Sequence, residues 1–197
     1  MKPSVPTRSL LAVLALCLPV AAFAEGGTIT GKVDVTPAKY TEDTVVYLKS
    51  VPGTFAPRKL SMDQKGMKFI PRVLTVTQGD TVRFLNNDGV AHNVYSPDGE
   101  SYNLGNFGKG EEASYTFKKT GVYTQLCSLH PEMLAYIFVG QNPYATAVDA
   151  KGNYTIKDVP PGTWEIAVWN ANKLKAPDEK VTVVAGKTVT QNFSVKR

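Results

Sequence analysis

The chain has 197 residues, of which 20% are charged, and a formal net charge of +5. This length allows one or two domains, each with a modest hydrophobic core. The basic residues are scattered among acidic ones and form no basic stripe, so the charge pattern excludes a nucleic-acid-binding surface.

The first segment has the pattern of an export signal. Two basic residues, Lys2 and Arg8, precede an apolar run over residues 10–20, and the small residues of "AFA" end the segment at Ala24. A membrane-spanning helix needs about 20 apolar residues, so the run is too short to be one. We therefore predict that residues 1–24 are a Sec signal peptide cleaved near Ala24. An uncleaved anchor is the alternative. Cleavage removes two basic residues and no acidic one, which lowers the net charge to +3.

Cysteine usage points to a special role for one residue. Cys17 lies within the predicted signal, so Cys127 is the single cysteine of the mature chain. It cannot form an intramolecular disulfide, although exported proteins commonly contain such bonds. An exported free thiol is prone to oxidation, so Cys127 is either buried and inert or bound to something.

Short stretches rich in Val, Ile, Thr, Tyr and Phe recur along the chain, separated by turn clusters such as "NNDG", "SPDG" and "PPG". The predicted strands cover residues 28–35, 44–49, 73–76, 81–86, 113–117, 135–139, 163–169 and 188–195. No segment shows sustained helical periodicity. The sequence therefore predicts an all-β chain that forms sandwiches or small barrels.

Four potential metal ligands lie at the ends of two predicted strands. Cys127, His130 and Met133 fall within "CSLHPEM", directly after one strand, and His92 follows another strand through a turn. A thioether is a poor zinc ligand, whereas two histidines, a cysteine and a weak axial methionine form blue-copper electron-transfer sites. The alternative is that Cys127 and Met133 are ordinary core residues and His130 is a hydrogen-bonded turn residue.

These residues also carry a family resemblance. "CSLHPEM" is similar to the copper loop of cupredoxins, with the short Cys-x₂-His-x₂-Met spacing of amicyanin. The stretch "LTVTQGDTVRFLNNDGVAHNV" resembles the cupredoxin strands that lead to the first copper histidine, and "GVYTQLC" resembles the approach to the thiolate. The resemblance covers about residues 69–139 and implies a Greek-key β-sandwich.

The resemblance also implies roles for particular residues. It makes His92, Cys127, His130 and Met133 the ligands of one copper ion that alternates between Cu(I) and Cu(II). It suggests that Asn93 braces the ligand loop through Ser128, because residues behind the ligands fix ligand orientation. Leu129 stands where amicyanin and plastocyanin carry proline, so we expect a less rigid loop.

The rest of the chain resembles a second sandwich. "DAKGNYTIKDVPPGTWEIAV" is similar to the carboxypeptidase regulatory-like, transthyretin-like fold, whose opening strands look like "GTITGKV" and "VVYL". We predict one discontinuous sandwich, residues 25–54 and 142–197, with a cupredoxin domain of residues 55–141 inserted in a loop. The alternative is two sequential domains with an extended N-terminal arm. Small exported bacterial plastocyanin-like proteins, some labelled methylamine-utilisation proteins, have this combination.

The function classes to distinguish are an electron carrier, a copper chaperone or store, and an enzyme. The resemblance favours a periplasmic type 1 copper protein that shuttles single electrons, with a copper chaperone or storage module as the alternative. Enzymes with a second copper need further histidines, and the chain has only two, so we expect no catalytic activity. The partner would be a c-type cytochrome or a dehydrogenase, met through an apolar patch of Leu129, Pro131 and Leu134 around His130.

Overall fold

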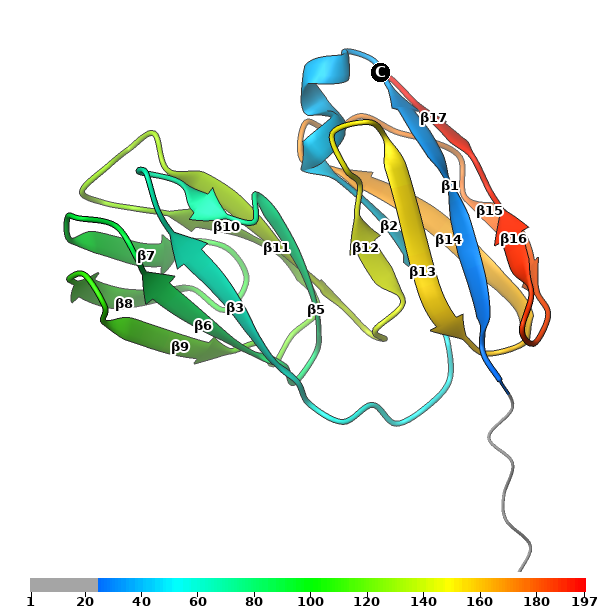
Figure 1. Ribbon diagram of the computed structural model, residues 1–197, viewed down its shortest axis with the longest axis horizontal. Coiled ribbons are helices and arrows are strands. Elements are labelled where there is room, and N and C mark those ends of the chain that lie inside the picture. Colours follow the sequence, from blue (N-terminus) through cyan, green and yellow to red (C-terminus); the bar gives the residue numbers. More distant parts are fainter. Residues whose placement is uncertain (1–24) are drawn as a thin grey trace, which may run out of the picture.

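The computed structural model describes residues 25–197, so the export signal predicted for residues 1–24 lies outside the described residues. The described chain is almost entirely β-structure, with one short 3₁₀ helix, η1 (Ala38–Asp43), and this confirms the all-β prediction. Its strands form two sandwiches that lie side by side (Figure 1). None of the helices within residues 25–197 has the length and apolar character needed to cross a membrane.

The central sandwich is built from residues 59–140 and occupies the green and cyan half of Figure 1. One sheet has the order β5-β11-β10-β7-β8 and the other the order β4-β3-β6-β9. The bounds of the first sheet are β5 (Val73–Thr77), β11 (Leu134–Gly140), β10 (Gly121–Leu126), β7 (His92–Ser96) and β8 (Tyr102–Phe107). Those of the second are β4 (Phe69–Ile70), β3 (Lys59–Gln64), β6 (Thr81–Asn86) and β9 (Glu112–Thr116). Phe84, Phe117 and Tyr123 are the largest side chains fully buried between them.

The terminal sandwich combines strands from both ends of the described chain. One sheet has the order β13-β1-β16, with β17 also paired to β1, and the other the order β12-β2-β14-β15. The bounds of the first sheet are β13 (Asn153–Val159), β1 (Gly27–Val35), β16 (Thr188–Thr190) and β17 (Phe193–Val195). Those of the second are β12 (Ala145–Ala147), β2 (Thr44–Leu48), β14 (Gly162–Asn170) and β15 (Glu179–Val183). The chain therefore leaves this sandwich after β2 and returns to it at β12, as Figure 1 shows.

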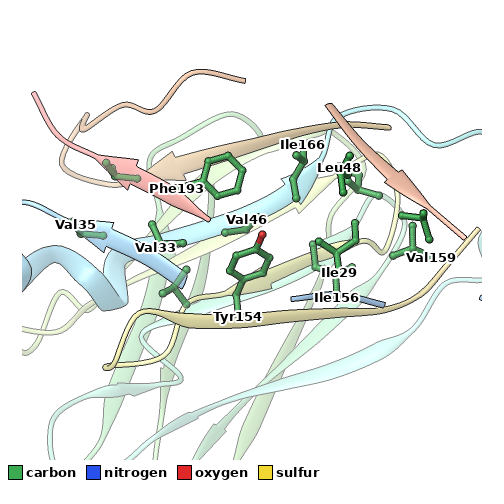
Figure 2. Packing of buried hydrophobic residues seen from close by; sticks show 14 of the residues in the cluster. Ile29, Val33, Val35, Val46, Leu48, Tyr154, Ile156, Val159, Ile166 and Phe193 are labelled. Carbon is green, nitrogen blue, oxygen red and sulfur yellow. The ribbon is translucent and has the colours of Figure 1, made fainter. Parts of the chain in front are cut away.

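The core of the terminal sandwich follows from side-chain alternation along its strands. In β1, Ile29, Val33 and Val35 are buried, whereas Lys32 and Asp34 between them are exposed. Successive side chains of a strand point to opposite faces, so this pattern turns one face of β1 inward. Figure 2 shows these inward residues packed with aliphatic and aromatic side chains from β2, β13, β14 and β17.

One predicted strand is divided in two. Residues 188–195 were expected to form a single strand, but β16 and β17 pair separately with β1. A side chain at Gly31 of β1 would place its Cβ only 1.8 Å from the carbonyl oxygen of Gln191, so the two backbones approach closely there. Asn192 then accepts the Lys32 backbone N–H through its side-chain Oδ1 at 2.8 Å. This side-chain contact replaces a backbone ladder bond and interrupts the strand.

The two sandwiches contact each other directly. Val73 and Phe138 of the central sandwich pack with Val45 of the terminal sandwich in a shared hydrophobic cluster. The Phe138 ring lies 4.7 Å from the Tyr47 ring, centroid to centroid. That residues 25–54 with 142–197, and residues 55–141, are separate folding units stays a prediction.

Candidate metal centre

The sheet topology brings His92 and Cys127 to one end of the central sandwich. His92 is the first residue of β7, and Cys127 directly follows the last residue of β10. These strands are antiparallel neighbours, paired through Tyr95 and Leu126. The start of one strand therefore lies beside the end of the other, which places residues 35 positions apart in the chain at the same edge.

The remaining two predicted ligands lie in the loop that connects β10 to β11. Leu126 and Leu134 are paired across these antiparallel strands, so the seven residues 127–133 form a closed connection. Within it, the Met133 backbone N–H donates to the His130 carbonyl oxygen at 3.0 Å, which makes a tight turn after His130. The turn keeps His130 on the same side of the loop as Cys127.

Three donor atoms converge at this edge. The Nδ1 atoms of His92 and His130 are 3.0 Å apart, and the Cys127 Sγ is 3.8 Å from the His130 Nδ1. The candidate ligand atoms of these three residues all lie within 4.8 Å of one another. Bonds from a divalent first-row metal to imidazole nitrogen and thiolate sulfur are about 2.0 and 2.3 Å long. A single ion therefore fits between the three donors without a large movement of any of them.

Burial differs sharply between the predicted ligands. His92 is completely buried, and Cys127 and Met133 are 2% and 1% exposed, whereas His130 is half-buried. Met133 belongs to the same core cluster as Cys127. The centre is thus shielded from water on three sides, and only the His130 side approaches the surface.

The three residues of the predicted partner patch differ in exposure. Leu129 is 44% exposed, Pro131 is also exposed, and Leu134 is half-buried. These apolar residues lie in or next to the loop that carries His130. Glu132 is exposed in the same loop and adds one negative charge.

Asn93 connects the two strands behind the donors. Its side-chain Oδ1 accepts the Ser128 backbone N–H at 3.3 Å, and its own backbone N–H points to the Cys127 Sγ at 3.3 Å. Its Nδ2 donates to Asn103 Oδ1 and to the Gly105 carbonyl, at 2.8 and 2.9 Å. Asn93 and Ser128 are therefore in contact, through the backbone of Ser128 rather than its hydroxyl.

Two features near the centre were missed by the sequence reasoning. The Asp88 carboxylate lies 3.0 Å from the Nε2 of His92, on the opposite side of the ring from His130. Hydrogen bonds from the Met67 N–H, the His92 ring and the Gly89 N–H lower the pKa of Asp88 to about 2, so the carboxylate is ionised at neutral pH. The sequence does contain a signal for this contact, because Asp88 lies four residues before His92, across a turn.

The second feature is a contact with the terminal sandwich. Arg72 donates from Nε to Asp43 Oδ1 of η1 at 2.9 Å and from Nη1 to the Leu134 carbonyl at 2.6 Å. Leu134 directly follows Met133, so this arginine ties the end of the ligand loop to the other sandwich. A cavity of about 420 Å³ beside it is lined by Met133 and Met67 among others.

Comparisons with known proteins place the same segment in a family. Residues 56–140 match the family model described as "Copper binding proteins, plastocyanin/azurin family". The chloroplast plastocyanin of Chlamydomonas reinhardtii is 44% identical over 36 residues, which cover 18% of this chain and 25% of that protein. The match thus spans a quarter of that plastocyanin's length.

Several solved structures are also similar. A purple cupredoxin from Nitrosopumilus maritimus is 26% identical and covers 41% of this chain and 98% of its own, with a TM-score of 0.38. A reduced amicyanin variant is 30% identical, with coverages of 41% and 80% and a TM-score of 0.39. A Cu-containing nitrite reductase from Thermus scotoductus is 28% identical, with coverages of 49% and 25% and a TM-score of 0.42.

A second family model matches the C-terminal part of the chain. Residues 138–191 match the model described as "Polysaccharide lyase family 4, domain II", which supports an additional domain there. That this domain is of the carboxypeptidase regulatory-like type stays a prediction. The first match contains all four predicted ligands, and it confirms the resemblance on which copper was expected. Residues 56–140 are therefore similar to the plastocyanin/azurin family of copper-binding proteins.

Proposed function

We propose that this protein carries single electrons through one copper ion held by His92, Cys127, His130 and Met133. The observation that supports this most is the convergence of two imidazole nitrogens and one sulfur within 4.8 Å, inside the segment that matches the copper-binding family. Bound copper supplies a one-electron couple, Cu(II)/Cu(I), whose two states prefer different ligands: imidazole suits both and sulfur favours Cu(I).

The chain's own residues prepare that site. Burial of His92, Cys127 and Met133 keeps water away from the donors, and the Asn93 N–H orients the Cys127 sulfur. A hydrogen bond to the cysteine sulfur is one of the features by which proteins adjust the potential of a blue-copper site. Because the donors come from strand ends and a closed loop, they are held in place before the metal binds.

Electrons would enter and leave on the His130 side. His130 is the more exposed of the two histidines, and the apolar residues Leu129, Pro131 and Leu134 lie in or next to the same loop. A small apolar surface with few charges suits brief redox encounters, which bury little area. The proposed partner is a c-type cytochrome or a dehydrogenase, met in the periplasm after removal of residues 1–24.

We further propose that the cupredoxin unit, residues 55–141, is inserted in a discontinuous regulatory-like sandwich of residues 25–54 and 142–197. The pairing of β1 with β13 and of β2 with β14 supports this arrangement. The terminal sandwich offers no three-residue metal cluster among residues 25–197, since the one cluster found lies in the central sandwich. The role proposed for this sandwich is to dock, orient or stabilise the copper unit.

One observation favours a second candidate, a copper chaperone or storage module. Met67 is 47% exposed and lines the same cavity as the buried Met133. An exposed thioether close to a buried one is a feature that a Cu(I) delivery route needs, because soft sulfur ligands prefer Cu(I). The two functions differ in how readily the bound copper exchanges.

The visible spectrum of the mature protein with one equivalent of Cu(II) tests the proposal. An electron carrier should show an intense thiolate-to-copper charge-transfer band that ascorbate bleaches and an oxidant restores, with copper retained against a chelator. A folded, copper-loaded protein without that band, or one that loses copper rapidly to the chelator, would favour the chaperone. Met133→Gln should keep the band but lower the potential, because an axial oxygen stabilises Cu(II).

A further inference from the structure

The two nitrogens of the His92 ring face different partners. Nδ1 lies 3.0 Å from the Nδ1 of His130, on the side where the donors converge, and Nε2 lies 3.0 Å from the Asp88 Oδ2. An ionised carboxylate only accepts hydrogen bonds, so the short contact requires a proton on Nε2. A neutral imidazole with its proton on Nε2 has its free lone pair on Nδ1, which is the atom that faces His130 and Cys127.

Asp88 is itself held from two further directions. Its Oδ2 also accepts the Met67 N–H at 2.8 Å, and its Oδ1 accepts the Gly89 N–H at 2.8 Å. Its backbone N–H donates to Asn86 Oδ1 at 2.9 Å. The carboxylate side chain is only 18% exposed. These contacts leave it little freedom to turn away from His92.

The Met67 amide that meets Asp88 comes from an unusual turn. Gly66 and Met67 connect β3 to β4 with backbone φ angles of +61° and +56°. Positive φ at both central residues is the type I′ geometry that matches the twist of a two-stranded hairpin. A methionine adopts such a conformation rarely, because its Cβ crowds the backbone. The hairpin thus places one specific N–H against the Asp88 carboxylate.

The two histidines differ in whether a carboxylate contacts the ring. Within residues 25–197, His92 has a carboxylate at hydrogen-bonding distance of its outer nitrogen, whereas none is found at His130. His92 is also completely buried, and His130 is not. The Asp88 carboxylate therefore contacts one imidazole of the pair directly and not the other.

We propose that Asp88 is a positioning residue for His92, which fixes the ring in its Nδ1-binding tautomer and, as a fixed anion behind it, favours Cu(II) over Cu(I). This inference rests on the proposed copper function. A carboxylate behind a ligating histidine raises the basicity of that ligand. The more positive oxidation state gains more from this effect, so Asp88 lowers the reduction potential of the centre.

Three variants separate the charge of Asp88 from its hydrogen bond. Asp88→Asn retains an acceptor oxygen without the charge, and Asp88→Ala removes both. The matched control is Asp63→Asn, because Asp63 contacts the neighbouring Asn87 and has no contact with His92. It changes the net charge of the same region by the same amount.

We expect Asp88→Ala to weaken Cu(II) binding about 10- to 100-fold, as is typical when the partner of a ligating histidine is lost. Asp88→Asn should have a smaller effect of the same sign, and Cu(I) binding should change less in both. If Cu(II) affinity falls ten-fold relative to Cu(I) affinity, the potential rises by about 59 mV. Asp63→Asn should leave the potential near that of the wild type.

The His92 ring provides a readout that needs no copper. Nitrogen chemical shifts of the metal-free wild type and of Asp63→Asn should show the proton on Nε2, and Asp88→Ala should show a mixture of tautomers. A wild-type ring protonated on Nδ1, or equal potentials in Asp88→Asn and Asp63→Asn, would overturn the inference. A wild type without a charge-transfer band would instead contradict the proposed copper function, so the two failures can be told apart.

Discussion

The two sandwiches bury polar side chains for different purposes. In the central sandwich, one group of buried polar residues lies at or beside the metal centre, where Asn86, His92 and Asn93 are at most 2% exposed. In the terminal sandwich, the side-chain Nδ2 of the buried Asn170 donates to the Oγ1 of the buried Thr44 at 2.8 Å. It also donates to the carbonyl of Tyr40, which lies in η1 just before β2 begins. Buried polar groups are costly unless they are hydrogen-bonded. In the central sandwich, these buried polar groups position the predicted metal ligands. In the terminal sandwich, they fix the short helix η1 against the strands.

This difference indicates which property a substitution in each sandwich should affect first. The hydrophobic core of the terminal sandwich is aliphatic and aromatic throughout, so it depends on volume and shape. The central sandwich depends in addition on two separate hydrogen bonds to predicted ligands, one from the Asn93 N–H to the Cys127 sulfur and one between the His92 Nε2 and Asp88. We therefore expect substitutions in the first to affect stability, and substitutions in the second to affect the metal centre before they affect the fold.

The largest effect is expected for Cys127→Ser. It should abolish the visible band of the copper-loaded protein, because the thiolate is the donor of the charge transfer, and leave the far-UV circular dichroism of both sandwiches unchanged. Ser128→Ala is the matched control. Only the backbone of Ser128 contacts Asn93, so this variant should keep the band. A band that survives in Cys127→Ser would mean that the sulfur is not a ligand.

Division of the chain tests whether the two sandwiches are independent. A fragment of residues 55–141 should fold and bind copper alone, and residues 25–54 joined by a short linker to 142–197 should form a second folded sandwich. Both should melt at lower temperature than in the whole chain, because Val73 and Phe138 lose their packing against Val45. Cooperative folding of residues 142–197 alone, with failure of the joined fragment, would favour sequential domains.

A buried carboxylate far from the donors allows a test of stability alone. Asp80 is 1% exposed and accepts hydrogen bonds from the Arg58 side chain at 2.7 and 3.0 Å and from the Thr77 N–H at 2.8 Å. Asp80→Asn should reduce the free energy of unfolding by about 1.5–3 kcal/mol, the usual range for hydrogen bonds to a charged group.

The control for Asp80 comes from the surface of the terminal sandwich. Asp34 is 77% exposed and lies 3.9 Å from Lys32, so Asp34→Asn should cause no measurable change in urea unfolding. The visible spectrum should be the same in both variants. Loss of copper binding in Asp80→Asn would show that the network of Arg58 and Asp80 supports the centre as well as the fold.

The smallest effect is expected for substitutions in the apolar patch, which should change the rate of electron transfer and leave the structure of the copper site unchanged. Leu134→Lys, and less strongly Leu129→Lys, should slow electron self-exchange and transfer to a cytochrome while the spectrum stays nearly unchanged. The reason is that a charge at the His130 side repels the same charge on a second copy and reduces apolar contact with a partner. Both variants could keep normal rates while substitution of exposed residues near His92, such as Val90, slows transfer. That result would mean that electrons leave through His92 and not through His130.

The fold class and most strands could be predicted from the sequence because they depend on local pattern. The alternation of residues 28–35 became β1, and the turn clusters between strands became loops. The division of residues 188–195 could not be predicted, since it depends on how closely Gln191 approaches Gly31 across the sheet. Two further strands also escaped notice: β8, which includes Asn103, Gly105 and Asn106, and β12, which is only three residues long. Their pairing partners make them strands more than their own residues do.

The predicted metal ligands could also be found from local features of the sequence. Cys127, His130 and Met133 lie in one loop, and the scarcity of cysteine and histidine drew attention to His92. The convergence of His92, Cys127 and His130 in the structure agrees with that reasoning, while the ligand role of Met133 stays a prediction.

The sequence by itself determined the kinds of donor, their order and the β-structure that carries them, because residue type and local spacing act within a few positions of the chain. Only the tertiary structure decided what surrounds the donors. The Met67 amide reaches Asp88 across 21 positions, and Arg72 reaches the Leu134 carbonyl across 62. Such contacts depend on strand register and on the packing of one sandwich against the other, which no local pattern in the sequence specifies.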